Sequence, residues 1–391
     1  MKILSVNAGS SSLKFQLYNM PEQEVLISGN FERIGIGQSF YTLKINGEKV
    51  KKEKELNNHA EAFETLVSEL LDNKVIESLD EIHGIGHRVV QGGDYFDKTV
   101  IVDDEVLNKV DELSALAPLH NPAAVVGIKA AMKVFKNAVN TVVFDTAFHQ
   151  TMKEENYLYA LPYSWYTDYK VRRYGAHGTS HKFVSMRMNE ILGRDDTKLI
   201  TCHIGNGASI SAVLNGKCIN TSMGLTPNAG LIMGTRCGDI DASIIPYIME
   251  KTNMTPKDID NAINKESGLL GLSGYSDSRD IENGIANGDE KCILAQKMYV
   301  RRIIDYIAKY YVELGGADAI IFTAGIGEKA IDTRRDVING LSSLGIYLDS
   351  DANNVKSEER LISTKDSKVE CWIIPTDEEL MIAKDTYELV K

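Results

Sequence analysis

The chain has 391 residues, a formal net charge of −12, 43% hydrophobic residues and 25% charged residues. These values are typical of a globular protein of about two domains, and the acidic balance argues against a general nucleic-acid binder. The apolar start is too short for a signal peptide, and no apolar run is long enough to span a membrane. Five scattered cysteines without a CxxC pair favour reduced thiols, so we expect a cytoplasmic protein that binds no membrane.

Hydrophobic runs that alternate with helical patterns predict a mixed α/β protein. In chain order we expect strands at 2–6 and 13–18, a helix at 59–71, a strand at 83–90, a helix at 122–135, a strand at 141–145, a helix at 181–193, strands at 198–204 and 209–214, a long helix at 291–315, and strands at 319–325 and 370–375. Asn121 and Pro122 predict the N-cap and first residue of their helix. The charged run 49–55 has no apolar face and is expected at a solvated edge or turn.

Two stretches of the chain resemble each other. ILSVNAGSSSLKFQLY (3–18) and ITCHIGNGASISAVLNG (200–216) each read as an apolar strand, an asparagine with small residues, and a second strand. Each is followed later by a buried strand that ends in a polar turn, VVFDTAFH (142–149) and IIFTAGIGE (320–328). The repeat indicates two halves built alike, with their small-residue turns facing one cleft.

The first of these turns is rich in serine. Lys14 falls inside the second strand and no helix follows, so the segment is not a Walker A loop, which needs GxxxxGK[ST] between a strand and a helix. Backbone N–H groups and the hydroxyls of Ser10, Ser11 and Ser12 could hold an anion, and Asn7 could hold a metal-bound water. A plain β-hairpin with a Ser-rich turn is an equal alternative.

Three segments place arginine or histidine among glycines, at 86–93, 172–181 and 233–243. The guanidinium groups of Arg88 and Arg236 match phosphate or carboxylate bidentately, although a structural salt bridge is the commoner role of a single arginine. Three such segments, each with glycines that let backbone approach a ligand, favour anion binding.

Other polar residues follow predicted strands or precede helices. Asp145 could orient a metal or a substrate group, or cap a helix. Glu378 could bind magnesium through water, or serve only the helix dipole. The Gly-rich segment 322–328 suits a nucleotide. His120 could donate to phosphate or be a satisfied loop histidine, and His203 lies within a strand, where a core histidine is the default.

Ten motifs resemble those of the acetate kinases in order and spacing: SVNAGSSSLKF, GHRVVQGG, APLHNPA, VFDTAFHQTM, RRYGAHGTSH, HIGNGAS, TSMGLTP, MGTRCGDID, FTAGIGE and PTDEEL. The resemblance covers essentially the whole chain. It implies two duplicated ribonuclease H-like α/β domains, as in actin, Hsc70 and sugar kinases, around a nucleotide cleft. The implied domains are 1–147 plus 380–391 and 148–379, and the implied assembly is a homodimer. The implied reaction is reversible, direct in-line phosphoryl transfer between ATP and acetate, giving acetyl phosphate and ADP.

The resemblance also implies roles for residues at matching positions. The catalytic set is Asp145, Arg88, Arg236 and His177. The substrate-binding set is Arg88, Val90, Leu119, His120, Ala176 and Pro227. The nucleotide-binding set is Lys14, Ser10, Ser12, His203, Asn206, Gly207, Asp277, Ser278, Arg279, Gly325, Ile326, Gly327 and Lys329. The Mg²⁺ ligands, which could also hold Mn²⁺, are Asn7 and Glu378.

Two departures from the family pattern bear on specificity. Ala176 stands where the family usually has phenylalanine in the wall of the acyl pocket, so propionate could be accepted unusually well. Lys329, beside the nucleotide loop, could alter nucleotide preference. The alternatives are a propionate or butyrate kinase of the same family, or an actin- or Hsc70-like clamp that uses ATP to move. Such a clamp does not need Arg88, Arg236 and His177 around an acceptor.

Overall fold

The structure is a computed structural model, and it describes residues 1–118 and 120–391. The chain forms two compact units, unit 1 from Met1–Phe148 with Asp377–Lys391 and unit 2 from His149–Thr376. The expected domains, 1–147 plus 380–391 and 148–379, stay a prediction. No helix in the described ranges is long and apolar enough to cross a membrane.

Unit 1 is built on an eight-stranded sheet with the strand order β5-β4-β3-β2-β1-β6-β8-β7. Its strands are β1 (Lys2–Gly9), β2 (Ser12–Asn19), β3 (Glu24–Glu32), β4 (Phe40–Ile45), β5 (Glu48–Glu53), β6 (Ile82–Val89), β7 (Val100–Ile101) and β8 (Val139–Phe144). Its α-helices are α1 (His59–Asp72), α2 (Asp104–Glu112), α3 (Asn121–Val134) and α14 (Glu378–Val390). Strands β1, β6 and β8 are parallel neighbours, so their carboxyl ends lie at one edge of the sheet.

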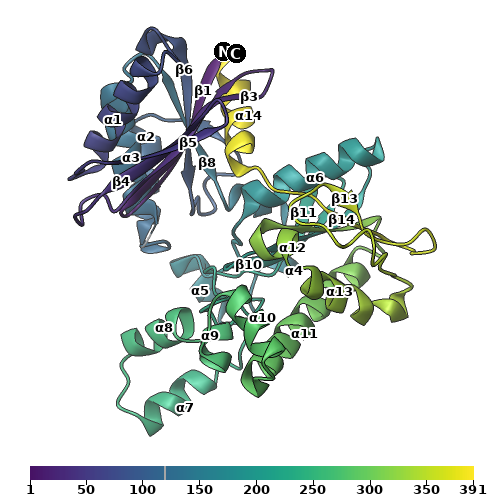
Figure 1. The fold of residues 1–391 in the computed structure, drawn as a ribbon. Coiled ribbons are helices and arrows are strands. Elements are labelled where there is room, and N and C mark those ends of the chain that lie inside the picture. Colours follow the sequence, from purple (N-terminus) through teal and green to yellow (C-terminus); the bar gives the residue numbers. More distant parts are fainter. Residues whose placement is uncertain (119) are drawn as a thin grey trace. The chain divides into compact units, whose positions relative to one another are not determined.

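Helices cover both faces of this sheet (Figure 1). Alternation along β1 sends Leu4 and Val6 into a core shared with α1 and α3, whereas Ile3 packs with Ala383 of α14. The glycine-rich sequence of β6 is explained by α14. A Cβ atom on Gly86 would lie 2.3 Å from Thr386 Oγ1 and 2.5 Å from Ile382 Cγ2, so only glycine admits the helix so close.

Unit 2 has a six-stranded sheet with the order β11-β10-β9-β12-β14-β13. Its strands are β9 (Lys198–Ile204), β10 (Ala208–Leu214), β11 (Lys217–Thr221), β12 (Ala319–Thr323), β13 (Arg360–Leu361) and β14 (Glu370–Ile373). Its α-helices are α4 (Glu154–Tyr157), α5 (Tyr163–Tyr169), α6 (Gly178–Leu192), α7 (Ile244–Lys251), α8 (Pro256–Lys265), α9 (Gly268–Ser273), α10 (Ser278–Ala286), α11 (Glu290–Glu313), α12 (Ala324–Lys329) and α13 (Ile331–Gly340). Six consecutive residues of β9 are buried, so both faces of this central strand are covered.

The two sheets share one strand arrangement. In unit 1, β3-β2-β1 is antiparallel and β1, β6 and β8 are parallel; in unit 2, β11-β10-β9 is antiparallel and β9, β12 and β14 are parallel. The duplication indicated by the sequence repeat is therefore present. The sequence repeat paired the segments that contain β8 and β12, but the strand order gives another correspondence. Strand β12 occupies the position of β6, and β14 occupies the position of β8.

Two local expectations are wrong. The helix at 121–134 has His120 at its N-cap position, and the Asn121 side chain instead bonds Gln91, accepting from its N–H at 3.1 Å and donating to its carbonyl at 2.9 Å. Strand β12 ends at Thr323 rather than at 325, because Ala324 turns the backbone into α12 with a φ of 65°. The charged run 49–55 does form a solvated edge, since every residue of β5 is exposed.

Candidate active site

One group of polar side chains gathers where β1, β6 and β8 of unit 1 end. We call Asn7, Lys14, Arg88, Asp145 and Glu378 the unit 1 cluster. Asn7 pairs with Lys14 across the first hairpin, and Lys14 forms an ion pair with Glu379, next to Glu378 in the first turn of α14. Ser10 lies exposed in the hairpin turn, and Ser12 begins β2.

Arg88 and Asp145 form a bidentate pair at this edge. Arg88 Nε donates to Asp145 Oδ1 at 2.9 Å, and Nη2 donates to Oδ2 at 2.7 Å. The Asp145 carboxylate raises the pKa of Arg88, with smaller contributions from Glu378 and Glu379. The two bonds fix the orientation of the Arg88 guanidinium, as expected of an orienting carboxylate.

The unit 1 cluster offers oxygen ligands that fit Mg²⁺. Burial raises the pKa of Glu378 above its usual 4.5, although the positive charge of Arg88 opposes this shift. In residues 1–118 and 120–391, no three His, Cys, Asp or Glu side chains are grouped to hold a metal ion. A site of one carboxylate and the Asn7 amide oxygen suits Mg²⁺, which usually keeps several waters and binds substrate phosphates.

A second group of residues converges on the hairpin tip between β9 and β10 of unit 2. We call His177, His203, Asn206, Gly207 and Arg236 the unit 2 cluster. A Cβ atom on Gly207 would lie 3.4 Å from Arg236 Nη2 and 3.6 Å from His177 Nε2, so both side chains reach this glycine. The rings of His177 and His203 stack, with centroids 4.1 Å apart and planes at 20°.

The unit 2 cluster is suited to an anion. Arg236 donates from Nη1 to the Pro227 carbonyl at 2.8 Å, and burial lowers its pKa. Within the part of the chain that the structure describes, no carboxylate forms an ion pair with Arg236, in contrast to Arg88. A half-buried guanidinium without an acid beside it, close to an imidazole nitrogen, is a binding group for phosphate or carboxylate oxygens.

His177 has an unusual backbone conformation. It precedes α6 with φ 57° and ψ 22°, in the left-handed region that non-glycine residues seldom adopt. Such conformations cluster at functional sites, where the surrounding structure holds them. The arginines of the same segment are structural, because Arg173 donates to the carbonyls of Thr221 and Ser222, and Arg172 lies over the ring of Tyr157.

The residues expected at the nucleotide base form two separate groups. Asp277 is the N-cap of α10 and accepts hydrogen bonds from Arg279, which lower its pKa to about 2; Ser278 is the first residue of that helix. Gly325, Ile326, Gly327 and Lys329 all lie in α12. Among the described residues, no hydrogen bond or ion pair joins the two groups. A Cβ atom on Gly325 would meet only open space, so this face of α12 is free to approach a ligand.

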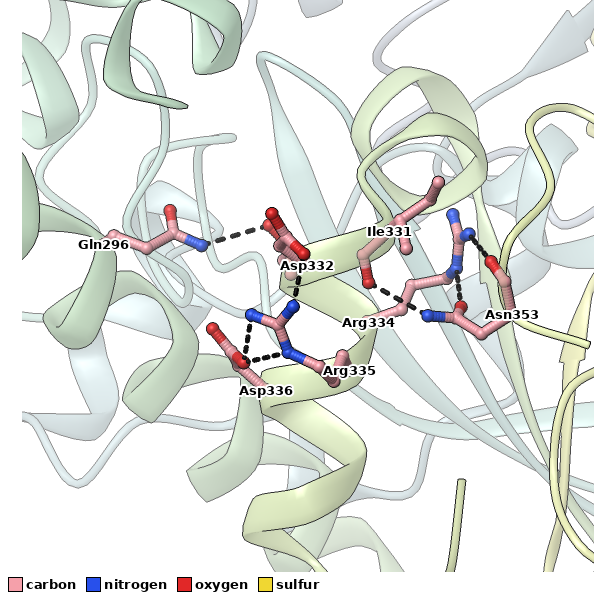
Figure 2. Close-up of polar contacts among 8 residues, drawn as sticks. Gln296, Ile331, Asp332, Arg334, Arg335, Asp336 and Asn353 are labelled. Atoms are coloured by element: carbon pink, nitrogen blue, oxygen red, sulfur yellow. Dashed lines mark hydrogen bonds and ion pairs between the residues drawn. The ribbon is translucent and has the colours of Figure 1, made fainter. Parts of the chain in front are cut away.

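A buried arginine, Arg334, anchors α12 through the Gly327 carbonyl, and Figure 2 shows its hydrogen bonds to Asn353. Arg334 is fully buried; it donates from Nη1 to the Gly327 carbonyl at 3.0 Å, from Nε to Asn353 Oδ1 at 2.8 Å, and from Nη2 to the carbonyls of Asn353 and Val355, both at 2.9 Å. Sequence reasoning did not identify Arg334, because its role depends on carbonyls that only the fold brings together.

The expected acyl-pocket residues lie in different surroundings. Val90 follows β6 and is half-buried, and His120 is exposed at the start of α3, whereas Leu119 lies outside the described residues. Ala176 is 3% exposed and belongs to the unit 2 core. Its carbonyl accepts a hydrogen bond from His149 Nε2 at 2.9 Å.

Sequence reasoning also missed His181, which lies behind His177. His181 Nε2 and His177 Nδ1 are 2.8 and 2.9 Å from the same hydroxyl, that of Ser209. The signal was present in HGTSH, where the two histidines stand four residues apart, as neighbours on a helix do. The expected helix began at 181, but α6 begins at Gly178 and includes the turn that links them.

Comparison with known proteins covers the full length of the chain. The sequence profile of the acetokinase family matches residues 2–384. The chain belongs to the acetokinase family. It is 52% identical over 393 aligned residues to the acetate kinase of Bacillus velezensis and to that of Bacillus subtilis, with 100% of each chain covered in both cases.

Solved structures agree with this membership of the acetokinase family. The acetate kinase of Porphyromonas gingivalis superimposes with a TM-score of 0.95 at 46% identity, covering 100% of both chains. A propionate kinase from Francisella tularensis superimposes with a TM-score of 0.94 at 42% identity, covering 99% of both chains. The expected family and the expected duplicated α/β fold of the actin, Hsc70 and sugar-kinase type are both confirmed.

Proposed function

We propose that the protein transfers the γ-phosphoryl group of ATP to acetate, reversibly, giving acetyl phosphate and ADP. Its relatives at 52% identity are acetate kinases over their full length. The observation that carries the proposal is the meeting of Arg236 and His177 Nε2 at Gly207, where the arginine has no acid partner among the described residues. Phosphoryl transfer requires this kind of fixed positive and hydrogen-bonding group around the moving phosphoryl oxygens.

Each cluster has a distinct proposed role. In unit 1, Arg88 binds the substrate carboxylate, and its bidentate bond to Asp145 keeps the guanidinium in one orientation. In unit 2, Arg236 neutralises the transferring group, and His177 donates a hydrogen bond to it. Acetate is already ionised at neutral pH, so the reaction needs no general base. The protein acts by positioning two anions and reducing the repulsion between them.

The nucleotide and the metal complete the proposal. Asp277, Ser278 and Arg279 bind the nucleoside on one side, and Gly325, Ile326, Gly327 and Lys329 bind it on the other. Lys14, Ser10, Ser12, His203, Asn206 and Gly207 contact the phosphates. Asn7 and Glu378 would hold Mg²⁺, which supplies positive charge to the phosphate oxygens when it is bound; Mn²⁺ offers the same preference for oxygen ligands.

A propionate kinase is the second candidate. Ala176, with Val90 and Pro227, is proposed to border the acyl group, and alanine leaves more room there than phenylalanine would. One additional methylene in such a pocket changes kcat/KM by only about 10- to 200-fold. The structural similarity to a propionate kinase keeps this alternative open.

The test is to trap acyl phosphate as hydroxamate, with Mg²⁺-ATP and acetate, propionate or butyrate in turn. We expect acetate to give the highest kcat/KM. Equal or higher values with propionate would identify the second candidate. ATP hydrolysis without any hydroxamate would refute the kinase proposal and favour a nucleotide-dependent clamp. Omitting Mg²⁺, or replacing it with Mn²⁺, tests the metal in the same assay.

We also propose a homodimer located in the cytoplasm. The dimer is supported by large apolar side chains that unit 2 exposes, namely Leu161, Tyr163, Trp165, Tyr169, Ile240, Ile244 and Tyr247. The location is supported by five free cysteines, since oxidising compartments favour disulfides. Light scattering on the purified protein tests the dimer, and cell fractionation tests the location.

A further inference from the structure

A chain of hydrogen bonds extends from His177 into the core of unit 2. His177 Nδ1 lies 2.9 Å from Ser209 Oγ, which lies 2.8 Å from His181 Nε2, and His181 Nδ1 lies 2.7 Å from Thr201 Oγ1. Ser209, His181 and Thr201 are fully buried. Water therefore does not reorganise these bonds, and each group must satisfy its neighbour.

The direction of these hydrogen bonds follows from the number of protons on His181. His181 is neutral, because burial lowers its pKa well below 6.5, and the nearby His149 and His203 lower it further. A neutral imidazole carries one proton, so one of its nitrogens donates and the other accepts. His181 therefore either accepts from Thr201 and donates to Ser209, or donates to Thr201 and accepts from Ser209.

The hydroxyl of Thr201 distinguishes the two directions. If Thr201 donates to His181 Nδ1, its hydroxyl makes a good hydrogen bond, with 2.7 Å between Thr201 Oγ1 and His181 Nδ1. If Thr201 instead accepted from His181, its hydroxyl could donate only to the Ser211 carbonyl. That oxygen is 3.5 Å from Thr201 Oγ1, beyond the usual range for a hydroxyl donor. A buried donor without a good partner costs about 1–3 kcal/mol. Thr201 therefore donates, and His181 carries its proton on Nε2 and donates it to Ser209. Among the described residues, His177 Nδ1 is the one side-chain acceptor within reach of the buried Ser209 hydroxyl, so Ser209 donates its own proton to His177 Nδ1.

The consequence appears at the other nitrogen of His177. With Nδ1 accepting, the neutral ring carries its proton on Nε2, the atom that reaches Gly207 beside Arg236. The charged or titratable groups near the ring include Arg236 at this glycine, His203 stacked on it, and His181 behind Ser209. Arg236 supplies positive charge at this glycine, so a neutral N–H donor from His177 completes the binding groups for an anion.

We propose that Thr201, His181 and Ser209 are positioning residues that hold His177 as its neutral Nε2–H tautomer. His177 then donates to the transferring phosphoryl group without first taking up a proton. This inference rests on the proposed function, because it concerns how His177 performs its role there. It predicts that activity does not depend on protonation of His177.

The test compares two substitutions of Thr201. Thr201→Val removes the hydroxyl at nearly constant volume, and Thr201→Ser keeps the hydroxyl but loses a methyl group. We expect the wild type and Thr201→Ser to keep a level kcat from about pH 6.5 to 8.5, a range above the ordinary histidine pKa. In Thr201→Val the tautomer is no longer fixed, so kcat should fall about tenfold toward pH 8.5, with KM for ATP and acetate within about twofold of the wild type.

Several outcomes would overturn the inference. A wild-type kcat that falls about tenfold per pH unit above pH 7 would mean that His177 acts protonated. Equal effects of Thr201→Ser and Thr201→Val would mean that Thr201 is only structural. Failure of the proposed function looks different, because the wild type would then form no hydroxamate at any pH, whereas failure of this inference alone leaves wild-type hydroxamate formation intact.

A measurement on the wild type avoids any folding defect of the variants. Protein labelled with ¹⁵N-histidine reports which ring nitrogen of each histidine carries the proton, and the His177 signal is the one lost in His177→Gln. The inference requires an unprotonated Nδ1 and a protonated Nε2 at pH 8. A protonated Nδ1 would refute it.

Discussion

Replacing Arg334 with lysine is expected to destabilise unit 2 strongly. Arg334 is fully buried and makes four hydrogen bonds to oxygen atoms of Gly327, Asn353 and Val355. Burial lowers its pKa to about 10. At pH 7 the arginine is therefore protonated, and lysine keeps the cationic type of side chain while losing the planar fork of donors.

The magnitude follows from counting the acceptors. A single ammonium group cannot reach oxygens that three guanidinium nitrogens reach, so at least two of the four buried acceptors lose their donor. Each such loss costs about 1–3 kcal/mol, so two of them give a decrease of about 2–6 kcal/mol in the free energy of unfolding. The pKa of Arg334 is depressed in the folded state. The unfolded chain therefore binds more protons only from about pH 10 up to the higher, ordinary pKa of arginine, and stability rises with pH in that range.

The assay is urea unfolding at pH 7, followed by tryptophan fluorescence. Trp165 and Trp372 are the two tryptophans of the chain, and both lie in unit 2, so the signal reports the unit that contains Arg334.

The matched control is the neighbouring residue, Arg335, which is half-exposed between Asp332 and Asp336 (Figure 2). Arg335→Lys should change the free energy of unfolding by no more than about 0.5 kcal/mol. Equal effects of Arg334→Lys and Arg335→Lys would refute the reasoning. Because Arg334 holds the Gly327 carbonyl, KM for ATP should rise in Arg334→Lys more than KM for acetate.

Three further outcomes are expected. Arg88→Lys should lower kcat by about 100-fold through loss of its buried bidentate pair, whereas Arg187→Lys, whose bidentate pair with a glutamate is exposed, should leave hydroxamate formation unchanged. Since burial raises the pKa of Glu378, the Mg²⁺ concentration that gives the half-maximal rate should increase as the pH falls toward that pKa. Glu378→Gln should weaken activation by Mg²⁺ and remove this pH dependence. The control, Glu379→Gln, should keep both the activation and its pH dependence. Ala176→Phe should lower the propionate-to-acetate ratio of kcat/KM about tenfold, and an unchanged ratio would exclude residue 176 from the acyl pocket.

The regular elements were the most predictable part of this protein. The strand expected at 198–204 is β9 without any change of limits, and the long helix expected at 291–315 is α11, which ends two residues earlier. Hydrophobic periodicity is a local property, so these elements can be read from neighbouring residues. Irregular turns were harder, because Asn121 and Ala324 respond to contacts far along the chain or to backbone strain.

The candidate site divides in the same way. Arg88 and Asp145 were visible in the sequence as polar residues at the ends of predicted strands, and Arg236 as an arginine between glycines on an irregular segment. Which of them is paired was not visible: Arg88 has Asp145, whereas Arg236 has no acid partner among the described residues. Whether an arginine is paired or available to a ligand depends on the side chains within a few ångströms of it. For Arg88, the pairing of β6 with β8 brings Asp145 close from a distant part of the chain.

The sequence by itself determined the family, the duplicated α/β organisation and most residues of both clusters, because these are recorded in motifs and in local hydrophobic patterns. Only the tertiary structure revealed the packing of α14 on the glycines of β6, the anchoring of α12 by Arg334, and the hydrogen bonds from Thr201 to His177. Each of these joins segments that sequence patterns treat separately. The direction of a hydrogen bond and the cost of a buried charge depend on distances that only the folded chain defines.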